Sequence, residues 1–435
     1  GTVAIGYTAL GSMTTGQYNV AVGFEAMLTE TQGDRNTAVG YQALKDQTGT
    51  TGTVGNTAVG YHAGKGVVTG KFNTFIGGNS GETASGSAVD NNAALGYAAL
   101  GKLNSGSRNT ALGTAAGQLF QNASDIVAVG YYTLANANTS TDIDGCVAVG
   151  SLSQAENKTG QGNVSVGKSA LQTDVNGDNS TAIGHEALKV QNGVSGNVGN
   201  TAVGNNALHD HTSGQQNTAI GAFAMSTNLT GRYNTVVGYE AFAAANGAED
   251  NHVIIGRSAG YNLDGAQNCV MVGRSTQGSA AGATNQNVFG YHAAGQVDNS
   301  VTLGNGDVTK VYMSEDGDAE MYANGTINTS DRRLKENIDD SDLGLEFVNK
   351  LRPVSYKFKK DKQSNKLKYG IIAQEVQEVL KETNNEDFAG ITDKGDYLGA
   401  DYVQFIAPLI KSVQELTEMV KSQQKEIEEL KNKQG

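Results

Sequence analysis

The chain has 435 residues and a net charge of −13, with 58 glycines, two prolines, two cysteines and no tryptophan. The negative balance argues against a nucleic-acid-binding protein, because phosphate binding needs clustered Lys and Arg. No run of about 18 apolar residues occurs, so we expect no membrane insertion. No signal peptide is visible and the first residue is Gly1, so we expect a fragment or a processed product.

Composition divides the chain near Ser330. Residues 330–435 contain 20 acidic and 18 basic side chains, which leaves 24 acidic and 13 basic ones for residues 1–329 out of totals of 44 and 31. Only six of the 58 glycines lie beyond Ser330. We therefore expect a repeat shaft over 1–304, a β-type neck over 305–329 and a charged domain over 330–435.

A repeat centred on glycine fills the expected shaft. "NTAVGYQAL" at 36–44 returns as "NTAIGAFAM" at 217–225, and the glycines are mostly 17 residues apart. A large apolar residue precedes each glycine and alanine usually precedes that residue, which predicts a short strand with two unlike faces. The glycine itself permits a bend or a close approach that a Cβ would block. The glycines of the eighteen units are Gly6, Gly23, Gly40, Gly60, Gly77, Gly96, Gly113, Gly130, Gly150, Gly167, Gly184, Gly204, Gly221, Gly238, Gly256, Gly273, Gly290 and Gly304.

Seventeen residues cannot close a core alone, but stacked coils can, each burying its aliphatic row against the next. We therefore predict a mainly β protein whose shaft is a parallel β-solenoid, or β-roll, of 17-residue coils. Because alanine lies opposite the aliphatic row, that face suits close packing of several chains around a common axis. The pattern resembles the repeat of YadA-like trimeric adhesin heads and the repeated shafts of virus fibres, which implies a trimeric shaft.

Other side chains of the shaft are weaker candidates. Cys146 and Cys269 fall in strand positions of the repeat and are expected to be buried, reduced thiols. In "HDH", His209 and His211 would share one face of an extended segment, but the motif occurs once, so we expect neither a metal nor a cofactor. The tyrosines that follow many glycines could stack on sugars or cap the rungs. The longer loops are better candidates for receptor contact; these are 45–55, 80–91, 135–145 and 189–199.

Half of the residues in "TSDRRLKENI", 329–338, are charged. Alone, the segment is typical of a helix start with Ser330 as its N-cap. With "LRPVSYKFKK" (351–360), "YGIIAQEVQEVL" (369–380) and "YVQFIAPLIKSVQEL" (402–416), it resembles the intramolecular chaperone domain at the C-terminus of endosialidases and other phage tail fibres. That resemblance implies a small α+β domain that trimerises, templates folding of the fibre and then cuts itself off with a Ser/Lys dyad.

Carried onto this sequence, the resemblance makes Ser330 the nucleophile and Lys335 its base, with cleavage between Thr329 and Ser330. The activity would be that of a single-turnover, self-cleaving serine endopeptidase. Asp331, Arg333 and Ile338 also fit the family pattern, and we expect the two charged residues to be structural ion-pair partners. A spacing of five does not suit one face of a helix, so we expect a turn here or a dyad completed across chains.

The last helix is expected at about 401–433 and carries an apolar heptad pattern. The pattern fits two or three strands, so the trimer is implied by the resemblance; a helix packed against its own domain is the alternative. Pro408 should kink the helix or mark a turn near its start. The core positions are Ile406, Val413, Val420 and Ile427 at a, and Leu409, Leu416 and Leu430 at d.

Together these features predict a homotrimeric virion tail fibre or surface appendage, assembled in the host cytoplasm. Its partners would be further copies of itself and a host cell-surface receptor, with a glycan as one candidate. Two other functions stay open: a tailspike-type enzyme that degrades a host surface glycan, and a cellular trimeric adhesin. No paired carboxylates stand out in the shaft as a glycosidase site.

Overall fold

The structure is a computed structural model that describes residues 1–48, 51–82, 89–136, 143–192, 195–313, 332–357, 367–393 and 397–434. The chain forms two compact units, Gly1–Ala319 and Glu320–Gly435.

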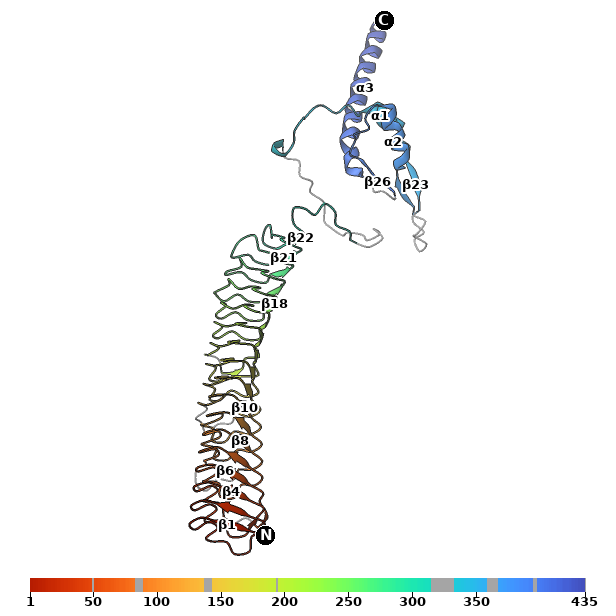
Figure 1. The fold of residues 1–435 in the computed structure, drawn as a ribbon. Helices are drawn as coiled ribbons and strands as arrows, with labels where there is room; N and C mark the ends of the chain where they lie inside the picture. The colour runs from red at the N-terminus through yellow and green to blue at the C-terminus, as the bar shows by residue number, and fades with distance from the viewer. Residues whose placement is uncertain are drawn as a thin grey trace. The chain divides into compact units, whose positions relative to one another are not determined.

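The first unit is a parallel β-solenoid, as the repeat predicts. Each coil contributes one short strand, which pairs in parallel with the strand of the next coil, so that the strands stack in chain order (Figure 1). Register follows the repeat, with Thr37 opposite Thr57 and Ala38 opposite Ala58. The stacked strands are β1 (Val3–Ile5), β2 (Val20–Val22), β4 (Thr37–Val39), β6 (Thr57–Val59), β7 (Thr74–Ile76), β8 (Ala93–Leu95), β9 (Thr110–Leu112), β10 (Val127–Val129), β11 (Val147–Val149), β12 (Val164–Val166), β14 (Thr181–Ile183), β16 (Thr201–Val203), β17 (Thr218–Ile220), β18 (Thr235–Val237), β19 (Val253–Ile255), β20 (Val270–Val272), β21 (Gln286–Phe289) and β22 (Ser300–Leu303).

Two longer coils add a second parallel pairing beside the main sheet. β3 (Gly33–Asp34) pairs with β5 (Gly52–Thr53), and β13 (Gly177–Asp178) pairs with β15 (Gly196–Asn197). β22 ends at Leu303, and the described residues 305–313 after it contain no strand.

The repeat glycines form a column in which consecutive coils touch. From Gly6 to Gly290 their φ angles lie between +126° and +144°, a region that L side chains rarely adopt. A Cβ on any of these glycines from Gly6 to Gly273 would lie only 2.2–2.6 Å from the carbonyl oxygen of the next glycine in the column. The predicted close approach is therefore confirmed, and it fixes the stacking of one coil on the next.

The side-chain directions correct one expectation. The central alanine of the strand points inward and is fully buried, as at Ala38 and Ala58, whereas the aliphatic residue before the glycine points outward, with Ile5 61% and Leu95 50% exposed. The expected burial of the aliphatic row between coils is wrong, because the interior is already filled from the opposite wall by large side chains such as Leu44. Where that wall has glycine instead, a large residue fits in the strand.

Phe75 is one such residue. It takes the alanine position, and a Cβ at Gly64 or Gly81 would lie 3.0 Å or 2.3 Å from its ring. The interior volume of the coil is thus conserved by exchanging small and large residues across it.

A column of buried residues, most of them asparagines, runs beside the alanines, one residue before the strands. The Oδ1 atom of Asn217 accepts a hydrogen bond from the backbone N–H of Asn234 in the next coil, at 3.1 Å, and its Nδ2 donates to the carbonyl of Gly231 at 2.8 Å. The same two bonds recur at Asn73, Asn92 and other members. Buried backbone groups are satisfied in this way without widening the coil.

Cys146 and Cys269 belong to this asparagine column, not to the strands as the sequence analysis had them. Both are free and buried, and burial raises the pKa of the Cys146 thiol to about 12. Each thiol donates to the carbonyl fourteen residues later, the partner that asparagine uses, at 3.3 Å for Cys146 and 3.4 Å for Cys269. Their predicted role as buried, reduced thiols is confirmed.

A second interior column lies seven residues after the glycines, and in several coils its residue is polar. It contains Glu30, Asp174 and His211, all at most 2% exposed. Asp174 accepts hydrogen bonds from the backbone N–H of Gly177 at 3.0 Å and from Nε2 of Gln191 at 2.9 Å. Burial nevertheless dominates and raises the pKa of Asp174 to about 6.

The second unit is a small α+β domain followed by a long helix. The helix α1 (Leu345–Lys350), the helix α2 (Ala373–Glu382) and the turn η2 (Tyr402–Phe405) enclose a core of Leu343, Phe347, Val376, Leu380 and Phe405. Two antiparallel pairs join β23 (Val354–Tyr356) to β24 (Lys368–Gly370) and β25 (Ile391–Asp393) to β26 (Leu398–Ala400). The turn η1 (Arg332–Leu334) precedes this core, and α3 (Ile406–Gln434) ends the chain.

Replacing Asn217 with alanine should destabilise the shaft. The change leaves the N–H of Asn234 and the carbonyl of Gly231 buried without partners, which costs about 2–4 kcal/mol of unfolding free energy. Urea unfolding followed by circular dichroism measures the loss. Asn205→Ala, at an exposed position of the same coil, is the matched control, and equal stability of the two variants would contradict the structural role of the column.

Asp174 should make shaft stability depend on pH. Its folded-state pKa of about 6 lies above the ordinary value of 3.8. Below pH 4 the carboxyl is largely protonated in the folded and unfolded states and does not destabilise the fold. Above pH 6 it is ionised in both states, and the folded state bears the full cost of the buried charge. The unfolding free energy of Asp174→Asn relative to the unmodified chain should therefore rise by on the order of 2–3 kcal/mol between pH 4 and pH 7.5.

The control for this pH experiment is Asp125→Asn. The guanidinium of Arg108 lowers the pKa of Asp125, so removing that carboxylate should shift relative stability in the opposite direction as pH rises. Parallel pH profiles of Asp174→Asn and the unmodified chain would show that this carboxylate carries no buried charge.

Candidate self-processing and assembly sites

The candidate processing segment is described from Arg332 onward. Thr329, Ser330 and Asp331 lie outside the described residues, so the structure does not place Ser330 against Lys335. Residues 332–334 form the 3-10 turn η1, and the backbone N–H of Lys335 donates to the carbonyl of Arg332 at 3.2 Å. The expected turn is therefore present within the segment, and Lys335 leaves it directly.

Three described side chains of this segment lie on the surface of the single chain. Arg333 and Lys335 are exposed, and Ile338 is 52% exposed. Ile338 therefore does not join the core around Phe347. The arrangement leaves this segment accessible to a neighbouring chain.

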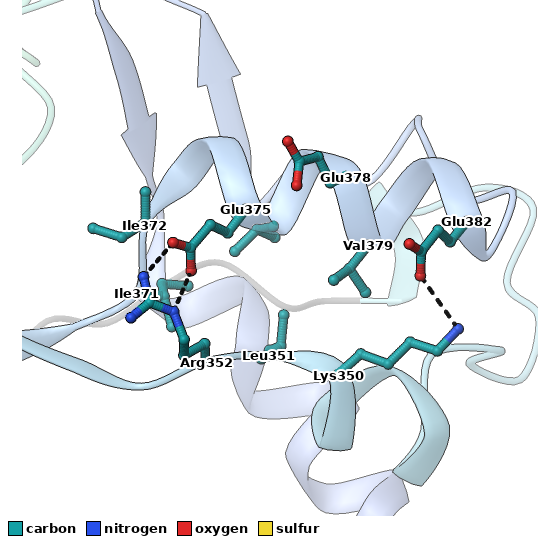
Figure 2. A pocket seen from close by; sticks show the side chains of 10 residues that line it. Lys350, Leu351, Arg352, Ile371, Ile372, Glu375, Glu378, Val379 and Glu382 are labelled. Atoms are coloured by element: carbon teal, nitrogen blue, oxygen red, sulfur yellow. Dashed lines mark hydrogen bonds and ion pairs between the residues drawn. The ribbon is translucent and has the colours of Figure 1, made fainter.

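A pair of ion pairs holds α1 against α2 beside a cavity of about 180 Å³. Arg352 binds both carboxylate oxygens of Glu375, and Lys350 Nζ lies 3.6 Å from Glu382 (Figure 2). The Arg352 guanidinium lowers the pKa of Glu375. Leu351 lies between the two pairs in the figure. These contacts join the end of one helix to the face of the other.

The four charged residues of these two ion pairs form what we call the ion-pair clasp, and the sequence analysis assigned them no role. Arg352 and Glu375 lie within two of the motifs that it quotes, whereas Lys350 and Glu382 lie just outside them. Lys350 and Arg352 flank Leu351, and Glu375 and Glu382 lie seven residues, or about two turns, apart on one face of α2. Two basic residues close together before Pro353 and two acidic residues at helical spacing were the available signal.

Helix α3 presents two different faces. Phe405 just before it, then Pro408 and Ser412, are buried against the domain, and the carboxylate of Glu415 accepts a hydrogen bond from the backbone N–H of Leu345 at 2.7 Å. This bond caps the start of α1. Pro408 lies in the first turn of α3, directly after η2, as expected for a proline near a helix start.

The predicted heptad residues lie on the other face of α3. None of them is buried by its own domain: exposure ranges from 44% at Val420 to 63% at Val413. The alternative, a helix packed against its own domain, therefore holds for the other face at the start of α3 but not for this row. The exposed row consists of Ile406, Leu409, Val413, Leu416, Val420, Ile427 and Leu430.

The two weak metal candidates do not share a site. His211 is buried in the interior polar column, where its Nδ1 lies 3.0 Å from the carbonyl oxygen of Asn228, and burial lowers its pKa. His209 lies on the surface, 2.6 Å from Asp210 and 3.4 Å from Glu186. The segment turns instead of extending, with Leu208 at φ 51°, so the expected common face is wrong. Among the described residues no three His, Cys, Asp or Glu side chains gather as a metal site.

The remaining surface candidates are partly described. Each of the four longer loops contains residues outside the described ranges, namely 49–50, 83–88, 137–142 and 193–194. The aromatic residues after the first repeat glycines stack on one another, with ring centroids 5.2–5.4 Å apart from Tyr7 through Phe24 and Tyr41 to Tyr61. In this part of the shaft the rings cap successive rungs. No helix in the described ranges is long and apolar enough to cross a bilayer.

Comparison with known proteins finds a family match within the second unit. Residues 330–384 match the family model described as "Chaperone of endosialidase", a stretch that contains the processing segment and the ion-pair clasp. No curated protein matches the chain. A C-terminal segment of the chaperone-of-endosialidase family behind a parallel β-solenoid shaft fits a tail-fibre protein with a C-terminal intramolecular chaperone.

Proposed function

We propose that the chain is the protomer of a homotrimeric virion fibre whose C-terminal domain templates assembly and then releases itself. The observation that carries this proposal is the apolar heptad row of α3, which faces away from its own domain directly after a segment of the chaperone family. Such a row is stable when neighbouring helices cover it. The family match favours three copies.

The shaft carries a second row that supports the same assembly. The residue before each glycine is aliphatic, except Phe289, and none of them is buried. Many members from Ile5 to Leu303 are more than a third exposed, including Leu112 and Ile220. The row follows the strand face of the solenoid, so a parallel copy in the same register would cover it rung by rung. An apolar strip of this length on a single chain indicates a contact surface.

Self-cleavage would use Ser330 and Lys335, the pair that the resemblance to the chaperone family implies. The Oγ of Ser330 attacks the carbonyl carbon of Thr329 while the neutral Lys335 amine takes the hydroxyl proton. The peptide nitrogen of Ser330 then leaves with that proton, giving an ester. Water opens the ester, which yields a carboxylate at Thr329 and restores the serine hydroxyl at a new N-terminus. The shaft and neck are released from the chaperone.

Assembly would provide the environment that this reaction requires. Lys335 is exposed in the single chain, and a lysine serves as a base once it is removed from water. A neighbouring chain packed over the segment would remove that water. On this account cleavage follows trimerisation, and loss of the template slows unfolding of the finished fibre. The shaft would then contact the host surface receptor.

Denaturing electrophoresis of freshly expressed protein tests the cleavage. The unmodified chain should yield a C-terminal fragment of about 11 kDa, which is 106 of 435 residues in 45.1 kDa. Ser330→Ala and Lys335→Ala should remain uncut or be cut about a hundredfold more slowly. N-terminal sequencing of the fragment should begin at Ser330.

The matched control is Ser341→Ala, a serine of the same segment whose hydroxyl donates to the carbonyl of Leu343 at 3.2 Å. It should be processed like the unmodified chain. A full-length band that persists in the unmodified, assembled protein would overturn the peptidase role, and cleavage of Ser330→Ala at the same bond would overturn the assignment of the nucleophile.

A further inference from the structure

A hollow of about 630 Å³ opens on the surface of the shaft over three consecutive coils. Its walls include the rings of Phe223, Tyr239 and Tyr261 and the polar side chains of Glu240, Ser226 and Ser258. This volume lies within the usual range for small-ligand sites, and the mixture of aromatic and hydrogen-bonding groups is typical of them.

The hollow lacks an ion pair that two other places on this face carry. Two residues after the glycine, Glu25 pairs with Lys45 at 2.7 Å, and Glu186 pairs with Lys189 at 2.8 Å. Both lysines lie five residues after a glycine. Glu240 holds the same position as the two glutamates.

At Glu240 the positions that supply the lysine hold other residues. The one in its own coil is Ala243, and the one in the next coil is Tyr261. Neither residue is a lysine, and Ala243, Ala244 and Tyr261 line the hollow. Glu240 also lines it, and no cation occupies either of the two lysine positions beside it.

The aromatic rings around the hollow are arranged differently from those near the N-terminus. There, Tyr7, Phe24 and Tyr41 stack with planes 8–13° apart, so each ring covers the face of the next. Phe223 and Tyr239 instead meet edge to face, at 81° and 6.2 Å. The guanidinium carbon of Arg257 lies 5.9 Å from the centroid of the Tyr239 ring. Tyr239 and Tyr261 are each 45% exposed, so ring surface beyond this contact is available to a ligand.

We propose that this hollow binds a ring of a neutral saccharide. The C–H face of a sugar would pack on Tyr239 or Tyr261, and its hydroxyls would donate to Glu240 and exchange hydrogen bonds with Ser226 and Ser258. The carboxylate disfavours acidic sugars in a chain whose net charge is already −13. This proposal specifies the ligand class of the proposed receptor-binding function. It rests on that function in assuming that the shaft contacts the host surface.

The hollow does not compete with the proposed contact between shafts. Its lining residues lie one to six positions after their glycines, whereas the aliphatic row lies on the strand, immediately before them. A shaft that pairs along its strands therefore presents one such hollow from each copy. Three weak sites on one rod would act together on a polymeric surface through avidity.

Binding to defined sugars tests the proposal with the full chain. The probes are immobilised neutral trisaccharides of hexose and of N-acetylhexosamine, together with their sialylated counterparts. We expect the unmodified chain to bind at least one neutral trisaccharide, and its sialylated counterpart at least tenfold more weakly. Tyr239→Ala and Ala243→Lys should each lose at least tenfold in affinity.

Ala243→Lys is the sharpest variant because lysine already occupies this position of the coil at Lys45 and Lys189, so the fold accepts it. It fills the hollow and pairs with Glu240. Tyr131→Ala, at the Tyr239 position of another coil, is the control and should bind normally. No binding of any neutral probe at millimolar concentration, equal binding by Ala243→Lys, or preference for the sialylated probes would each overturn the proposal.

Electrophoresis of the same four proteins separates the two proposals. Normal processing with no sugar binding would overturn the proposal of a saccharide site and leave the self-cleavage proposal intact. Sugar binding without processing would overturn only the self-cleavage proposal, because the hollow is complete within a single chain.

Discussion

The shaft depends on the contact between consecutive repeat glycines. Because a Cβ would lie 2.2–2.6 Å from the next carbonyl oxygen, the backbones of neighbouring coils meet at a separation that only glycine allows. The cross-section at that point is narrow, and alanine faces a large residue such as Leu44 across it. The aliphatic residue of the strand then has no room inside and projects outward.

Polar ladders complete the interior, and they explain why the shaft needs alignment from elsewhere. Most asparagines of the interior column make two hydrogen bonds to the next coil, one through Oδ1 to a backbone N–H and one through Nδ2 to a carbonyl. These bonds hold each coil to the next. Because they are nearly the same from coil to coil, they do not distinguish one coil from another. If shafts associate along their aliphatic rows, a slip by one coil would cost little in any single contact. A terminal domain that gathers copies at one end would fix the register and raise their effective concentration.

The sequence predicted the coil well because glycine spacing and the strand pattern are both periodic in it. The sequence could not decide which strand face points inward. Alternation with a period of two defines two faces, and the choice between them depends on the size of the side chains on the opposite side of the coil. For the same reason it missed that the asparagine before the strand and the residue seven after the glycine, His211 among them, are interior positions. In the C-terminal unit, the turn before Lys335 and the helix from Ile406 were predicted, whereas the ion pairs of Arg352 and Lys350 join segments that only folding brings together. The contact of Ser330 with its base stays a prediction, because Ser330 lies outside the described residues.

Two apolar rows, one on the shaft strands and one on α3, are left uncovered by the single chain, and the central claim is that copies of the chain cover both. The mass of the uncleaved chain in solution, measured by multi-angle light scattering, tests this most directly. The account predicts about 135 kDa, three times the 45.1 kDa of one chain. A folded, soluble species of one chain would contradict it.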